Sequence, residues 1–110
     1  FELREIPPSP QLQAPEASVD GLIVRWRARE GARYRYQLSR SESFEALLVD
    51  VTTDEPQAVL GKLPAGRYHL RVQTLDSDGY AGPFGPAQRI DVPRSSSWLL
   101  LPTLLLFLLL

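Results

Sequence analysis

The sequence predicts an all-β fold, an antiparallel sandwich of seven short strands. Several runs of residues alternate between apolar and polar side chains, which is the pattern of a strand with one buried face. Turn sequences rich in glycine, proline and aspartate separate these runs at short intervals, and no convincing amphipathic helix lies between them. A chain of 110 residues allows one domain with a single modest core.

The first part of the chain is predicted to supply an edge strand and two core strands. Several prolines before residue 16 keep the start extended and suit an edge strand around 11–14. After a turn at Asp20-Gly21, the strand over 22–27 places three apolar residues on one face: Leu22, Val24 and Trp26. The next strand, over 33–39, does the same with Tyr34, Tyr36 and Leu38.

Two further strands are predicted over 47–52 and 57–60, after a short helical turn at 41–46. The strongest alternation follows the turn at 63–66. Its inward residues are Tyr68, Leu70, Val72 and Thr74, and its outward residues are Arg67, His69, Arg71 and Gln73.

The predicted sandwich ends with one more loop and strand. A glycine- and proline-rich loop over 76–86 leads to a strand at 87–92, in which Ile90 and Val92 point inward. The segment Asp76-Ser77-Asp78-Gly79 resembles a calcium loop, but its glycine is fourth and Ala87 stands where the bidentate glutamate belongs. We therefore expect a turn with Gly79 at positive φ.

The residues that mark this core resemble those of the fibronectin type III domain: Trp26, Tyr36, and Leu63-Pro64-x-Gly66-x-Tyr68-x-Leu70-x-Val72. The resemblance implies a fibronectin type III-like sandwich over residues 1–93. It also implies a tyrosine corner, in which the Tyr68 hydroxyl bonds to the backbone near Leu63. The adjacent Leu63 and Pro64 depart slightly from the family's usual spacing.

Finer details are similar to the C-terminal modules of bacterial FecR-domain envelope proteins: Tyr34–Ser39, Ser43-Phe44 and Asp76-x-x-Gly79-x-x-Gly82-Pro83-Phe84. This resemblance implies a non-catalytic interaction or spacer module in the periplasm, anchored in the inner membrane, with other envelope proteins or peptidoglycan as partners. The chain also resembles, less closely, the triple-tyrosine β-domain of hybrid two-component sensors. The alternative function is therefore ligand sensing ahead of a transmembrane helix, and sequence beyond Leu110 would discriminate the two. Because the chain begins with Phe1, we expect a fragment or a processed form.

The C-terminal residues change abruptly in composition. A polar hinge at 94–97 precedes an apolar tail that we expect to be a membrane-associated helix, with anchor residues Trp98, Leu99, Leu104, Leu105, Phe107 and Leu108. About 13 helical residues reach roughly 20 Å, whereas a hydrocarbon core is about 30 Å thick. The helix therefore either continues beyond residue 110 or only inserts. The alternative is a helix packed on a soluble partner.

Nothing in the sequence predicts catalysis or a cofactor. There is no cysteine, and the single histidine, His69, is expected to be an ordinary surface residue. No nucleophile-elbow motif occurs, and no carboxylate pair falls on one strand face. A net charge of −1 argues against nucleic acid as a partner.

The one candidate site is a cluster of arginines. If the strands at 33–39, 67–74 and 87–92 are neighbours, five guanidinium groups share one sheet face: Arg33, Arg35, Arg67, Arg71 and Arg89. Such a face would bind carboxylates or phosphates of a partner. The alternative is a solvated face that acidic residues balance. Tyr80 and Phe84 are either loop contacts for that partner or aromatics that pack the loop.

Overall fold

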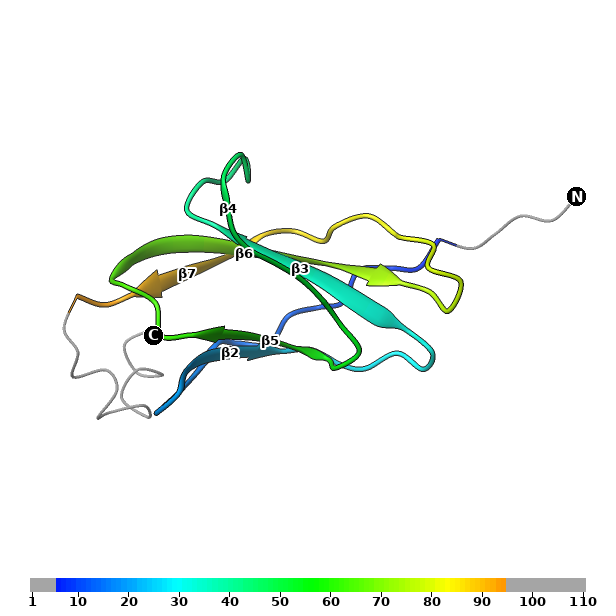
Figure 1. The fold of residues 1–110 in the computed structure, drawn as a ribbon, viewed down its shortest axis with the longest axis horizontal. Coiled ribbons are helices and arrows are strands. Elements are labelled where there is room, and N and C mark those ends of the chain that lie inside the picture. The colour runs from blue at the N-terminus through cyan, green and yellow to red at the C-terminus, as the bar shows by residue number, and fades with distance from the viewer. Residues whose placement is uncertain (1–5, 95–110) are drawn as a thin grey trace, which may run out of the picture.

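The computed structural model describes residues 6–94, which form an all-β fold of two packed antiparallel sheets (Figure 1). The seven strands in this part of the chain are β1 (Glu16–Ser18), β2 (Gly21–Arg25), β3 (Arg33–Ser39), β4 (Leu47–Thr53), β5 (Gln57–Gly61), β6 (Gly66–Leu75) and β7 (Gln88–Val92). No helix is present among residues 6–94. The predicted all-β class and strand number are confirmed.

The strands are divided between a three-stranded and a four-stranded sheet. Their orders are β1-β2-β5 and β4-β3-β6-β7. The chain crosses between the sheets after β2, β4 and β5, so each sheet contains strands from distant parts of the sequence. This order makes β3, β6 and β7 neighbours and leaves β4 and β7 at the edges of the larger sheet.

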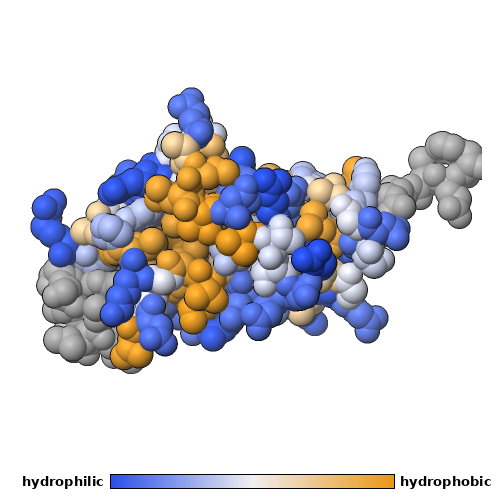
Figure 2. Space-filling model, in the orientation of Figure 1, coloured by the Kyte–Doolittle hydropathy of each residue, from blue (hydrophilic) through white to orange (hydrophobic). Residues whose placement is uncertain are grey.

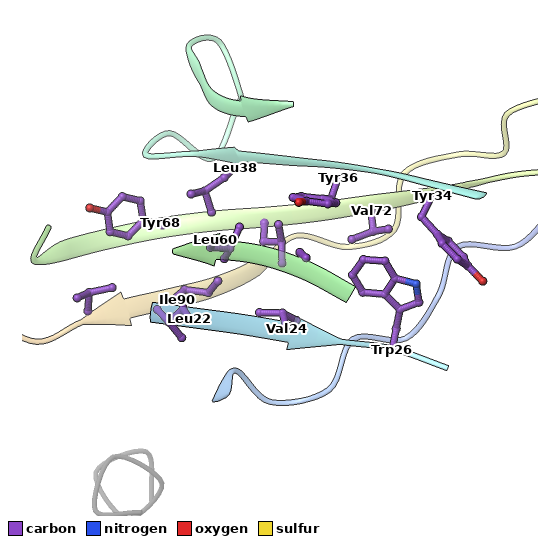
Figure 3. Packing of buried hydrophobic residues seen from close by; sticks show 13 residues of the cluster. Leu22, Val24, Trp26, Tyr34, Tyr36, Leu38, Leu60, Tyr68, Val72 and Ile90 are labelled. Carbon is purple, nitrogen blue, oxygen red and sulfur yellow. The ribbon is translucent and has the colours of Figure 1, made fainter. Parts of the chain in front are cut away.

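The core lies between the sheets and contains the apolar residues predicted to point inward, together with Ala58 and Leu60, whose facing was not predicted. Figure 3 shows side chains of both sheets meeting in this layer. The buried cluster contains Leu22, Val24, Trp26, Tyr34, Tyr36, Leu38, Ala58, Leu60, Tyr68, Leu70, Val72, Ile90 and Val92. The two-residue period therefore correctly predicted the buried face of β2, β3, β6 and β7.

Trp26 anchors one end of the core. Its ring meets Tyr34 edge-on at a centroid distance of 5.4 Å and Tyr36 at 6.4 Å. Among residues 6–94 the indole N–H has no hydrogen-bond acceptor, and Figure 3 shows the nitrogen-bearing edge turned toward Tyr34. Edge-to-face contact with an aromatic ring is a favourable arrangement for such a group.

The tyrosine corner lies at the other end. The Tyr68 hydroxyl donates a 2.5 Å hydrogen bond to the carbonyl of Pro64, as the sequence predicted for a backbone group near Leu63. The Arg40 guanidinium lies over the Tyr68 ring, 5.0 Å from its centroid. The corner thus ties the turn before β6 to the strand itself.

Two local predictions were wrong. Residues 11–14 do not form an edge strand: they make one bridge, Leu12 with Trp26, and the regular edge strand is β1. Pro10 and Pro15 bracket this segment and supply no backbone N–H, so a continuous ladder begins only after Pro15.

The expected helical turn at 41–46 is a non-helical turn. The Phe44 N–H bonds to the Ser41 carbonyl at 3.1 Å, and Phe44 adopts a left-handed conformation with φ 57°. A left-handed residue cannot continue a right-handed helix, so the chain turns into β4 instead.

The anchor residues of the tail lie outside the described residues, as does the predicted C-terminal helix. Within residues 6–94, no helix has the length and apolar character needed to cross a bilayer.

Candidate functional site

The outer face of the four-stranded sheet brings the five predicted arginines together. Arg33 and Arg35 lie on β3, Arg67 and Arg71 on β6, and Arg89 on β7. Strand pairing places the three strands side by side, because Gln37 of β3 pairs with Arg71 of β6, and His69 of β6 pairs with Arg89 of β7. The five arginines therefore share one surface. We call this surface the arginine face.

Four of the five arginines form ion pairs with aspartates. Arg33 Nε lies 2.7 Å from Asp54, and both Arg67 and Arg89 lie 3.2 Å from Asp91. Arg35 binds Asp50 with both ends of its guanidinium group, at 2.8 and 2.7 Å. An incoming anion therefore competes with a carboxylate already in place at each of these four positions.

The Arg35–Asp50 pair is the most specific of these contacts. The hydrogen bonds from Arg35 lower the pKa of the Asp50 carboxyl, and its partial burial opposes that shift. The same pair raises the pKa of the Arg35 guanidinium. Two parallel N–H···O bonds fix the relative orientation of the side chains, which single contacts at the other arginines do not.

Arg71 has a different environment, between two aromatic rings. Its guanidinium carbon lies 4.2 Å from the ring centroid of Phe44 and 4.2 Å from that of Phe84. Its Nε donates a 2.8 Å bond to Gln37, whose amide in turn contacts Asp50 at 3.4 Å. Arg71 thereby joins the β3–β4 loop to the β6–β7 loop, and Phe84 packs the loop rather than standing free.

These two loops cover part of the arginine face. The Ser39 hydroxyl donates to the Ala46 carbonyl, and the Gln73 amide donates to the Gly82 carbonyl, both at 2.9 Å. His69, expected on the surface, is only 6% exposed although it does lie on this outer side. The expectation was wrong because strand alternation decides which face a residue takes, whereas loops from elsewhere in the chain decide how far that face is covered.

The loop after β6 is a turn organised by Asp76. Its carboxylate accepts 2.9 Å bonds from the N–H groups of Asp78 and Tyr80, and its carbonyl accepts one from Gly79. Gly79 has φ 84°, as predicted. Tyr80 is 42% exposed at the tip of this loop, and no cluster of metal-binding side chains is present in residues 6–94.

The sequence did not predict the hollows beside the N-terminal segment. One, of about 350 Å³, is lined by residues 8–11, 27–29, Tyr34 and Thr74. The Arg29 N–H bonds to the Tyr34 hydroxyl at 2.7 Å there. This hollow combines residues distant in sequence, so no local motif could have indicated it.

Comparison with known proteins adds no assignment: no family model matches the chain, and no curated protein sequence matches it. The charged outer face is internally balanced by aspartates and is cross-linked to two loops through Arg71.

Proposed function

We propose that this chain is a fibronectin type III-like interaction or spacer module without catalytic activity. In this proposal it belongs to a bacterial envelope protein and stands in the periplasm, held at the inner membrane by the tail beyond residue 97. The observation that supports the fold assignment is the strand order β1-β2-β5 and β4-β3-β6-β7, combined with buried Trp26 and the Tyr68 corner.

The surface chemistry supports a role in contact or spacing. Four of the five arginines on the arginine face are ion-paired with aspartates, and Ser39 on the same face donates a hydrogen bond to the loop that covers part of it. Charge-paired surfaces of this kind contribute orientation and specificity to protein contacts. Envelope proteins and peptidoglycan remain the partners that this proposal implies.

Membrane anchoring is tested by flotation with vesicles of phosphatidylethanolamine and phosphatidylglycerol. The full chain should float with the vesicles, and a chain ending at Pro93 should stay in the soluble fraction. A matched control is Leu105→Arg with Leu108→Arg in the full chain, because each buried arginine opposes insertion by about 2.5–3.5 kcal/mol. If the full chain stays soluble, or the double variant floats equally well, the proposed anchoring is wrong.

A further inference from the structure

Strand β4 is an exposed sheet edge with little protection against pairing. Within residues 6–94 it pairs only with β3, and apart from a register shift beside Leu48 it runs for seven residues without proline, lysine or arginine. The opposite edge of the same sheet, β7, is shorter and lies between Pro86 and Pro93. β1 spans only three residues. Proteins normally protect long edges with such features, so an unprotected one marks a place where another strand can pair.

The backbone hydrogen bonds determine which groups of β4 face outward. The Val72 carbonyl accepts a bond from Gly85, on the side of β6 away from β3. Successive residues of an antiparallel strand direct their N–H and C=O groups to opposite neighbours. Arg71 therefore bonds toward β3, to its pairing partner Gln37.

The same alternation continues across β3 into β4. If Gln37 bonds toward β6, Tyr36 bonds toward β4 and its partner Val51. The N–H and C=O groups of Asp50 and Thr52 then face away from the sheet, whereas a register shift beside Leu48 interrupts the alternation there. They form a ready template for an additional strand.

The side chains along this edge are apolar. Leu47, Leu48 and Val51 are 39%, 53% and 39% exposed, and Figure 2 shows the apolar band that crosses the molecule here. The one charged residue within β4, Asp50, is already bound by Arg35. An added strand would cover apolar surface as well as satisfy backbone groups.

Charges at both ends of the edge indicate what occupies it. Glu42 and Glu45 precede β4 and Glu55 follows it, and none forms an ion pair in the part of the chain that the structure describes. A second copy paired antiparallel would place Glu45 near Glu55 of its partner, with unfavourable like charges at both ends. A strand that carries basic residues at its ends would gain attraction there instead.

We infer that the outer edge of β4 binds an extended, apolar segment of a partner protein that is flanked by lysine or arginine residues. The segment adds to the sheet beside β4, with backbone bonds to Asp50 and Thr52 and basic ends beside Glu45 and Glu55. This inference rests on the proposed interaction role and specifies the partner chemistry.

The test measures binding of a labelled peptide to the full chain in dodecyl maltoside micelles. The probe is acetyl-Lys-Lys-Val-Thr-Val-Thr-Val-Lys-Lys-amide, and its control has glutamate in place of each lysine. The basic peptide should bind at least about tenfold more tightly at low ionic strength, and salt should reduce the difference. Bound peptide should slow amide exchange at Asp50 and Thr52 but not at Val51, which is already bonded to β3.

Two variants examine the geometry. Thr52→Pro removes an outward N–H that the fold does not use, so the domain should remain folded while affinity falls at least about tenfold. Thr52→Ala keeps the N–H and should bind within about twofold of wild type. Leu48→Lys, at an exposed position, should also weaken binding of the basic peptide, whereas Val59→Lys on β5 should not.

Binding that survives both Thr52→Pro and Leu48→Lys would overturn the inference, as would equal binding of the acidic peptide. A dimer in sedimentation that Thr52→Pro abolishes would overturn it in favour of a second copy. Because vesicle flotation does not depend on this edge, a negative peptide result with normal flotation would leave the proposed anchoring intact.

Discussion

At the scale of single residues, Trp26 is the most consequential side chain of the core. It is 3% exposed and packs against Tyr34 and Tyr36 from the facing sheet. We expect Trp26→Ala to lower the free energy of unfolding by about 3–5 kcal/mol, because it leaves a large cavity between the sheets. Urea denaturation measures this change, and a loss below about 1 kcal/mol would show that the tryptophan is peripheral.

The Tyr68 hydroxyl offers a more selective test. Tyr68→Phe keeps the ring in the core but removes the bond to the Pro64 carbonyl, so we expect a loss of about 1–2 kcal/mol with the fold intact. Tyr36→Phe is the matched control, since the hydroxyl of this equally buried tyrosine forms no hydrogen bond within the described residues. Equal effects in the two variants would contradict the role of the corner.

Asp50 makes one part of the stability depend on pH. Arg35 lowers the pKa of this carboxyl in the folded state from its ordinary value of 3.8. The pair therefore stabilises the fold above that ordinary value, and its contribution is lost as the pH falls through the folded-state pKa. Urea midpoints of wild type and Asp50→Asn should differ at neutral pH and converge in strong acid. If the difference between the two urea midpoints is the same at neutral pH and in strong acid, ionisation of Asp50 does not contribute to the stability.

At the scale of elements, the turn between β1 and β2 depends on a glycine. Gly21 has φ +121°, and a Cβ atom there would lie 2.0 Å from the Gly61 carbonyl carbon on β5. We expect Gly21→Ala to cost at least about 3 kcal/mol, because strain and overlap with a backbone atom add together. Gly31→Ala is the control: φ is +77° there, but no atom of residues 6–94 would lie within 4 Å of the added Cβ, apart from the adjoining residues, so a loss of about 1 kcal/mol is expected. Thermal unfolding of both variants compares them directly.

The sequence predicted those strands whose buried face is determined by their own alternation of apolar and polar residues. The inward faces of β2, β3 and β6 follow from a two-residue period that each strand carries in its own residues. The loops could not be predicted in this way. Phe44 is buried because Arg71, on another strand, stacks against it, and no local pattern encodes that contact.

The arginine face illustrates the same limit for the candidate site. The five arginines of this face could be predicted by assuming that β3, β6 and β7 are neighbours, and the structure confirms this assumption. The ion pairs could not be predicted, because strand pairing and turns bring Asp50, Asp54 and Asp91 to their arginines. Net charge and composition cannot distinguish a paired surface from an open anion site.

At the scale of the whole molecule, the sandwich closes its core within the described residues. The buried cluster runs from Leu22 to Val92, and both sheets contribute to it. A chain ending at Pro93 should therefore unfold in urea with the same free energy as the full chain, within about 0.5 kcal/mol, because it retains every residue of the buried cluster. Both chains are compared in the same detergent micelles. If loss of residues 94–110 unfolds the domain, the leucines belong to its core, and the proposed membrane anchor must be abandoned.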